Sequence, residues 1–137
     1  MILQSPWVSF SGTSKAFREN EAKDFFSPHA SFQWSTAFLG DSPPHKSSTN
    51  SYNQPLNAPP EWWKDLPVKD VLILAGKGEN LSDDIVEFAS QLCEVKKVEF
   101  LLAEREAHAA PTLDLGIPFK DVGQHTKKVR EWLIEKI

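Results

Sequence analysis

The sequence predicts an α/β protein in which parallel strands are joined by crossover helices. Apolar runs of strand length lie at residues 2–10, 68–75 and 98–103, and such uninterrupted runs are typical of strands buried on both faces of a sheet. A segment with helical spacing lies between the last two runs, and another at residues 122–137 follows them. Strand, helix, strand, helix with short connections is the pattern of a right-handed crossover unit. With 137 residues, 40% of them hydrophobic, the chain is long enough for the core of one domain.

The first run, residues 2–10, begins almost at the first residue and has a proline near its start. It lacks a basic leader and a small-residue cleavage site, so we do not interpret it as a signal peptide. Chains rarely open inside a core element. We therefore expect that this strand has an unpaired apolar edge, and that the chain is marginally stable or associates with itself through that edge.

Residues 14–26 are compatible with a helix, and a clearer helix signal follows. Ser27 is a predicted N-cap, Pro28 occupies the first helical position, and Gly40 lies just past the end. The apolar residues of this second helix recur at near-helical spacing and are predicted to share one face: Ala30, Trp34, Ala37 and Phe38.

Residues 41–60 are polar and rich in proline. They predict an irregular loop, fixed at its ends by Tyr52, Leu56 and the Trp62–Trp63 pair. Composition alone leaves two interpretations open, an exposed linker and a lid over a binding site.

From residue 67 the pattern is regular. The strand at 68–75 leads into a turn at 76–80, and Ser82 is expected to cap a helix. Asp83 and Asp84 in the first turn of that helix complement its dipole. One apolar stripe faces the core: Ile85, Phe88, Ala89 and Leu92.

The strand at 98–103 is followed by a loop through Ala107–Pro111 and by the last helix. The residues of that helix expected to face inward are Val129, Trp132 and Leu133.

Charge and composition exclude several classes of function. The net charge of −4 argues against nucleic acid as a partner, because phosphate binding needs a basic stripe. No apolar run approaches the ~18 residues of a membrane span. The single cysteine, Cys93, allows no intrachain disulfide, which favours a reducing, cytoplasmic location; we interpret its side chain as a small apolar filler on a helix.

Two ionisable residues follow neighbouring strands of the predicted sheet. Glu79 comes after the strand at 68–75, and His108 after the strand at 98–103. In an open parallel sheet, sites form in the loops beyond the carboxyl ends of the strands. A carboxylate facing an imidazole there can fix its tautomer and stabilise the imidazolium, as in a catalytic triad. We therefore predict that Glu79 and His108 meet at one edge of the sheet.

Other interpretations compete with this site. A single histidine in a loop is often an exposed residue without a functional role, and Glu79 could likewise be an exposed surface residue. Asp83 and Asp84 are rival acids, although their place at a helix start explains them. A metal site built from the four histidines (His29, His45, His108 and His125) matches no familiar ligand spacing.

Six segments of the chain resemble the hormone-sensitive-lipase-like group of α/β-hydrolases, especially its fungal members. Ser5-Pro6-Trp7-Val8 resembles the strand after the nucleophile elbow. Three segments, residues 20–34, 37–40 and 55–63, resemble the cap region of that group. Residues 76–85 resemble its acid loop, and residues 107–111 resemble its histidine loop. This resemblance covers essentially the whole chain and implies the C-terminal portion of an α/β-hydrolase fold with a helical cap segment.

The resemblance divides the chain into a core strand and loop at 1–13, a cap or lid-like segment at 14–66, and a core portion at 67–137. It implies that Glu79 is the acid and His108 the base of a serine esterase acting on a small ester, with no cofactor. The acid is Glu where Asp is more usual, and Ala110 stands where an aromatic residue is often found.

The nucleophile of such an enzyme should precede its acid on a Gly-x-Ser-x-Gly elbow, and this chain contains neither that motif nor a His-Gly-Gly motif. Its nearest approach, around Ser14, lacks the final glycine, and we interpret Ser14 as a turn residue or helix N-cap. The chain by itself is therefore expected to be inactive, as a C-terminal fragment from a truncated gene or a gene model that starts too late. The alternative is a non-catalytic interaction protein that binds a partner through its exposed sheet edge or its aromatic cap.

Overall fold

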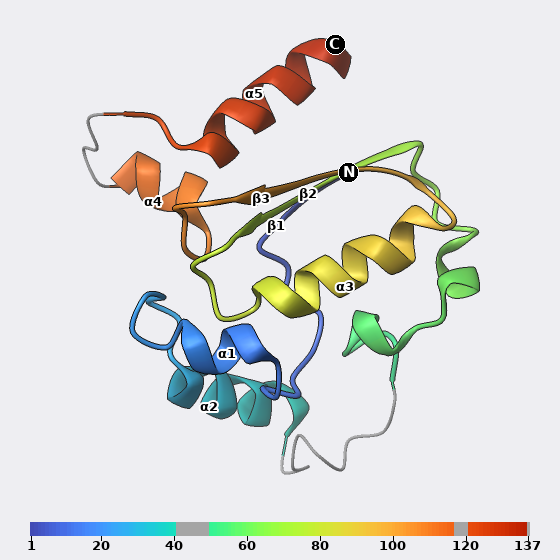
Figure 1. Cartoon of the computed structure of the whole chain (residues 1–137). Helices are drawn as coiled ribbons and strands as arrows, with labels where there is room; N and C mark the ends of the chain where they lie inside the picture. Colours follow the sequence, from blue (N-terminus) through green and yellow to red (C-terminus); the bar gives the residue numbers. More distant parts are fainter. Residues whose placement is uncertain (41–49, 117–120, 137) are drawn as a thin grey trace.

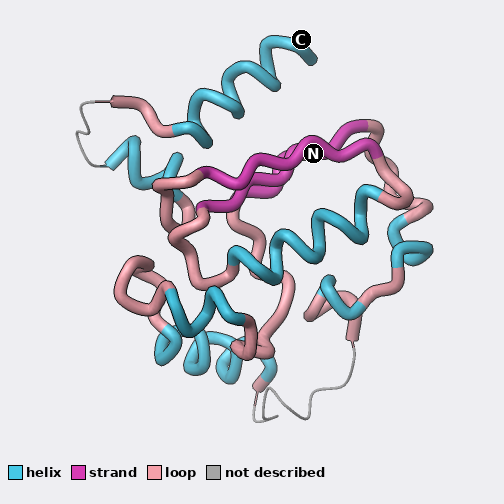
Figure 2. Tube along the Cα trace, in the orientation of Figure 1, coloured by secondary structure: helices cyan, strands magenta, loops and turns pink. Residues whose placement is uncertain are grey.

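A computed structural model of the chain describes residues 1–40, 50–116 and 121–136. Its centre is a three-stranded parallel sheet formed by β1 (Ile2–Gln4), β2 (Asp70–Gly76) and β3 (Lys97–Ala103), in the order β1-β2-β3. Helices lie on both sides of this sheet (Figures 1 and 2). The predicted class, α/β with parallel strands and crossover helices, is confirmed.

Strand β2 is the central strand because its residues are the most apolar of the three strands. Leu72 lies opposite Ile2 of β1 and Glu99 of β3, and every residue of β2 after Asp70 is buried. Side chains alternate between the two faces of a strand, so an unbroken apolar run is stable only where both faces are covered.

Each face of β2 packs on its own helix. On one face, Val71, Ile73 and Ala75 join the core with α3 (Ser82–Cys93). On the other, Leu72 and Leu74 pack with Trp132 and Val129 of α5 (Gln124–Lys136). Figure 1 shows α3 and α5 on opposite sides of the sheet. The stripe predicted for α3 is confirmed, because its four residues are buried: Ile85, Phe88, Ala89 and Leu92.

The strand predicted at residues 2–10 is wrong beyond Gln4. The Ser5 amide still donates to the Leu74 carbonyl (2.8 Å), but Ser5 has a φ of +45°, which turns the chain out of the sheet before Pro6. The carbonyl of Val8 then accepts from Leu56 (3.0 Å) instead of a strand. Residues 6–10 are largely apolar because some of them, such as Trp7 and Val8, pack in the core on the α3 face of the sheet and not within the sheet itself. Periodicity alone does not separate these two cases.

The two helices of the predicted cap segment begin where predicted, but the first ends at Glu19 and does not extend to residue 26. Helix α1 (Lys15–Glu19) begins after Ser14, whose hydroxyl accepts from the Phe17 amide at 3.4 Å. Helix α2 (Pro28–Leu39) begins after Ser27, whose hydroxyl accepts from the Ala30 amide at 3.1 Å, and ends at Gly40, where φ is +74°.

The shared apolar face predicted for α2 is not its buried face. Its buried residues are Ser31 and Ser35, whereas Trp34 and Phe38 are 55% and 67% exposed. The aromatic positions face outward because the small serines allow the close approach of α2 to the rest of the chain. The aromatic side chains of Trp34 and Phe38 therefore lie at the surface of the described structure.

The polar, proline-rich stretch contains two short 3₁₀ turns, η1 (Pro55–Asn57) and η2 (Pro60–Trp63). Residues 41–49, which belong to the predicted linker or lid, lie outside the described residues. The division of the chain at residues 13 and 66 stays a prediction.

Three further expectations in the second half are wrong. Ser82 is the first residue of α3 and does not cap it, since the N-cap is Leu81. Cys93 is exposed, because it lies at the end of α3 outside the buried stripe. Leu133 is 41% exposed, whereas Trp132 is buried as predicted.

One helix was missed. Helix α4 (Ala110–Gly116) directly follows the histidine loop, where the sequence predicted a loop. Pro111 is the second residue of this helix. Proline is tolerated in the first turn because the backbone N–H group that it lacks would have no partner within the helix. Among the helices that the structure describes, none is long and apolar enough to cross a membrane.

The outer edge of β1 has no strand partner in the described part of the chain. We expect the chain to associate through this edge, because unpaired parallel edges are templates for pairing. Sedimentation velocity should show a dimer or larger species that increases with protein concentration. A monomer over a hundredfold concentration range would contradict this prediction.

Candidate active site

The candidate site lies where the three parallel strands end. The residues after β1, β2 and β3 are Ser5, the turn 77–81 and the loop 104–109, and all three reach one edge of the sheet because the strands are parallel. Each loop contributes one polar group to a common cluster. These groups are the hydroxyl of Ser5, the carboxylate of Glu79 and the ring of His108.

Glu79 and His108 are in contact. Oε2 of Glu79 lies 3.0 Å from Nδ1 of His108. The Glu79 side chain is fully buried, whereas that of His108 remains 21% exposed. The sequence prediction that these groups meet agrees with this geometry; their role in catalysis stays a prediction. A ring held through Nδ1 by a buried acid can expose its other nitrogen, Nε2, to a reacting group.

The second carboxylate oxygen of Glu79 is also held. Oε1 accepts from the backbone amide of Gly76 and from the hydroxyl of Ser5 (3.2 Å). The carboxylate therefore has donors on both oxygens, which satisfies a buried acid and fixes its orientation toward the histidine.

The histidine loop lies directly on the acid loop. The Gly78 amide donates to the carbonyl of Glu106 (3.1 Å), and the Lys77 amide donates to the carbonyl of Ala103 (2.8 Å). A Cβ atom on Gly76 would overlap the Glu106 carbonyl group, so the two backbones approach as closely as glycine allows. This approach sets the distance between Glu79 and His108.

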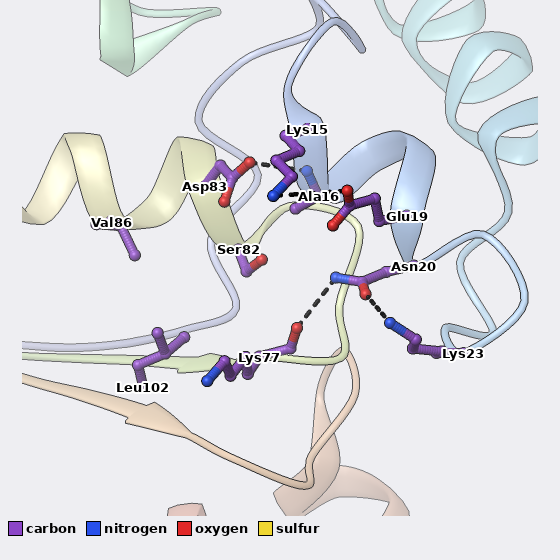
Figure 3. A pocket seen from close by; sticks show the side chains of 10 residues that line it. All are labelled: Lys15, Ala16, Glu19, Asn20, Lys23, Lys77, Ser82, Asp83, Val86 and Leu102. Atoms are coloured by element: carbon purple, nitrogen blue, oxygen red, sulfur yellow. Dashed lines mark hydrogen bonds and ion pairs between the residues drawn. The ribbon is translucent and has the colours of Figure 1, made fainter.

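Two side chains of the predicted cap segment bind to these loops, one to both of them and the other to the acid loop. Asp24 is buried, and its carboxylate accepts from the backbone amides of Asn80 (2.8 Å) and His108 (3.3 Å). The Asn20 amide group donates to the carbonyls of Lys77 and Glu79, both at 3.0 Å; Figure 3 shows the first of these bonds. The segment before α2 therefore holds both loops in place.

Aromatic side chains border the histidine. Phe26 stacks on the His108 ring with centroids 5.3 Å apart, and Phe25 contacts it edge-on at 5.7 Å. Phe26 also contacts Trp7 (5.1 Å) and Trp34 (5.3 Å), which continue into an open apolar hollow of about 420 Å³. Its walls are largely aromatic: Trp7, Phe10, Trp34, Phe38, Tyr52, Asn53 and Pro55.

A second hollow, of about 260 Å³, lies between α1 and the start of α3 (Figure 3). It contains neither Glu79 nor His108, and its charged residues already have partners. Lys15 pairs with Glu19 (3.5 Å), Lys23 donates to Asn20 (2.9 Å), and Asp83 accepts from the Ala16 amide (2.7 Å). This hollow is therefore a structural junction of α1 with α3.

The rival candidates lie elsewhere. Ser14 caps α1, as one of its two interpretations predicted. His29 is exposed on α2, and His125 is fully buried beside Glu106, while His45 lies outside the described residues. Within the part of the chain that the structure describes, no three His, Cys, Asp or Glu residues are placed to hold a metal ion.

Asp84, the other rival acid, is buried at the start of α3. Burial raises its pKa from 3.8 to about 6, and the charges of Glu87 and Asp83 add to the increase, whereas hydrogen bonds from Ser14 and Ser9 oppose it. Between these two pH values the folded state keeps a proton that the unfolded state has lost. Its contribution to stability therefore falls as the pH rises from about 3.8 to about 6.

We expect Asp84→Asn to stabilise the chain at about pH 8 by about 1 kcal/mol, after allowance for solvent screening and for the lost helix-start charge. At about pH 3, where the acid is protonated in both states, the variant should have wild-type stability. Urea unfolding at both pH values tests this expectation. An equal gain at both would show that titration is not the cause.

The sequence prediction missed Ser5, Asp24 and Asn20. Sites in parallel sheets form beyond the carboxyl ends of the strands, and this rule predicted Glu79 and His108. The same rule also indicates Ser5, because β1 ends at Gln4. Asp24 and Asn20 act across more than 50 residues of sequence, and no local pattern marks them.

Comparisons with known proteins support the fold. No model of a known protein family and no curated protein matches the chain. Several solved structures do. A hormone-sensitive lipase from a metagenome library aligns with a TM-score of 0.71 at 17% identity, over 99% of this chain and 44% of that chain. An esterase from Pseudomonas putida ECU1011 aligns with a TM-score of 0.69 at 19% identity, over 82% of this chain and 34% of that chain.

An esterase/lipase from an uncultured bacterium gives a TM-score of 0.69 at 20% identity, over 85% of this chain and 36% of that chain. The chain thus spans about a third to less than half of the length of these three proteins. At such low identity the likeness concerns the fold. The sheet, its helices and these superpositions together show that the chain has the fold of part of an α/β-hydrolase.

Proposed function

We propose that this chain supplies the acid and the base of a serine carboxylic-ester hydrolase, with Glu79 as acid and His108 as base. The observation that carries the proposal is the 3.0 Å contact between a fully buried carboxylate and a partly exposed imidazole beyond parallel strand ends. The esterases and lipases among the similar structures support it. The narrower resemblance to fungal members and a cytoplasmic location stay predictions from the sequence.

In this proposal each residue has one task. Glu79 keeps the proton of His108 on Nδ1, so Nε2 is free to accept a proton from a serine hydroxyl as that hydroxyl attacks the ester carbonyl. The resulting imidazolium is stabilised by the Glu79 carboxylate. His108 then returns the proton to the leaving alcohol, and an acyl-serine forms that water hydrolyses by the same steps.

The substrate we propose is a small ester with an apolar acyl or alcohol group. The aromatic contacts from His108 through Phe26 to Trp7 and Trp34 lead from the base to the open hollow beside α2. An apolar group in that hollow would cover aromatic surface that is now exposed to water, which favours binding by the hydrophobic effect.

The proposal also requires a nucleophile that these residues do not supply. No Gly-x-Ser-x-Gly elbow occurs in the sequence, and Ser14 is a helix cap. Removing the serine of a well-studied protease lowers turnover about a million-fold, so we expect the chain by itself to have no triad activity.

A chimera tests the proposal. The part of the Pseudomonas putida ECU1011 esterase that precedes its alignment with this chain is joined to residue 1, and hydrolysis of a short p-nitrophenyl ester is measured. We expect the chimera to be active and His108→Gln to lower kcat by at least about 10³-fold, because general base catalysis is lost.

The matched control is His29→Gln, which changes an exposed histidine on α2 and should leave kcat unchanged. An active chimera that His108→Gln does not affect would contradict the proposal. If the two parts do not assemble, the corresponding part of the esterase/lipase from the uncultured bacterium replaces the first one in the same measurement.

A further inference from the structure

Two residues beside the site have a backbone conformation that side chains other than glycine rarely adopt. In the described part of the chain, Ser5 (φ +45°) and Ala109 (φ +55°) are the only non-glycine residues with a positive φ. Ser5 directly follows β1, and Ala109 directly follows His108. Such conformations cost free energy and persist only where surrounding contacts enforce them.

One hydroxyl group joins these two residues to the acid. Oγ of Ser5 accepts from the backbone amide of Ala109 (3.1 Å) and donates to Oε1 of Glu79 (3.2 Å). Both bonds form at once, because a hydroxyl has one proton to donate and lone pairs to accept with. Ser5 is buried, so water does not readily replace either bond.

From this bridge we propose that Ser5 is the positioning residue of the Glu79–His108 pair. This proposal rests on the proposed function. In it, the Ser5 hydroxyl holds the Glu79 carboxylate through one hydrogen bond and the backbone that follows His108 through the other. The hydroxyl thereby fixes both the orientation of the Glu79 carboxylate and the position of the His108 ring relative to it. Ser5 touches neither the substrate nor the reacting atoms.

This role explains why a serine occupies a position where glycine would be less strained. Glycine at position 5 would adopt the same φ more easily, but it would leave the Ala109 amide without its partner. The Gly76 amide would then be the remaining donor to Oε1 of Glu79, and the carboxylate could rotate away from His108.

The test uses nuclear magnetic resonance on the ¹⁵N-labelled full chain at about pH 8, where histidine rings are ordinarily neutral. In the wild type we expect His108 to have its proton on Nδ1, with slow exchange of that proton with water. In Ser5→Ala and Ser5→Gly we expect a mixture of the two ring tautomers and exchange faster by on the order of tenfold, the factor that corresponds to one lost hydrogen bond.

The two variants separate the hydroxyl from the backbone. Ser5→Ala removes the hydroxyl and keeps the strain of the positive φ, whereas Ser5→Gly removes the hydroxyl and also relieves that strain. Equal effects of the two variants on His108 therefore identify the hydroxyl as the cause. Ser5→Gly also remains measurable if Ser5→Ala does not fold. Ser35→Ala is the control, because it removes a buried hydroxyl that donates to the carbonyl of Phe32 in the same helix (3.0 Å), and it should leave the His108 signals unchanged.

The outcomes are distinct. Unchanged His108 signals in a folded Ser5 variant would overturn the role of Ser5 and leave the proposed function intact. A wild-type chain in which the His108 proton is on Nε2 would overturn both, because the contact with Glu79 would then not hold the ring. A chimera that assembles but is inactive, combined with the expected resonance results, would contradict the proposed function alone.

Discussion

Replacing Glu79 by Gln is expected to lower the kcat of the ester-hydrolysing chimera by about 10⁴-fold, the loss seen when the acid of a serine protease triad becomes an amide. The amide oxygen of Gln would take the place of Oε1, where the Gly76 amide and the Ser5 hydroxyl both donate. The NH₂ group then faces Nδ1 of His108 and can only donate to it. This moves the ring proton to Nε2, the atom that has to accept a proton from the nucleophile.

The control for this change is Glu104→Gln. Glu104 lies just past β3 and pairs with Lys77 at 3.0 Å, but its side chain is 66% exposed, so the same substitution there should leave kcat within about twofold, as expected for a surface ion pair. Steady-state kinetics with the same p-nitrophenyl ester give both values. A Glu79→Gln chimera that keeps more than a tenth of its kcat would show that the acid does not set the tautomer.

The largest loss of stability is expected from Gly76→Ala. The new methyl group would overlap the carbonyl group of Glu106. Neither backbone can move freely, because the Gly78 amide is bonded to the Glu106 carbonyl and the Lys77 amide to Ala103 at the end of β3. Overpacking of a tight site typically costs 1–3 kcal/mol. For a clash with backbone we expect the upper end, about 3 kcal/mol, with a decrease in Tm of about 10 °C.

The comparison variant is Gly116→Ala. Position 116 ends α4, and a Cβ there would meet no atom within 4 Å, so its stability should change by less than about 0.5 kcal/mol. Thermal unfolding monitored by circular dichroism measures both variants. If Gly76→Ala were as stable as Gly116→Ala, the backbones of the acid and histidine loops could not be in close contact.

Local patterns in the sequence were sufficient for the elements whose signals do not depend on distant residues. The apolar run of β2, the stripe of α3 and the serine and glycine at the ends of α2 all predicted their elements, because burial on a sheet and capping of a helix are decided within one segment. The contact of Glu79 with His108 was predictable for a related reason. Neighbouring parallel strands bring their following loops to one edge, whatever the loops contain.

The sequence misled where the same composition is compatible with two environments. The run at residues 2–10 is apolar along its whole length, yet the chain leaves the sheet at Ser5. The aromatic residues of α2 have the spacing of a buried face, yet Trp34 and Phe38 are exposed. Burial depends on which surface faces the element, and that surface comes from other parts of the chain.

The sequence by itself determined the α/β class, the central strand and the identity of the two ionisable groups that meet beyond the sheet. Only the tertiary structure decided what holds those groups in place: the bridge from Ser5 to Glu79 and Ala109, the bonds from Asp24 to Asn80 and His108, and the approach of Gly76 to Glu106. The physical reason is that each of these contacts joins segments at least 30 residues apart. Their partners are chosen by the packing of the whole chain, and no periodicity or spacing within one segment records that choice.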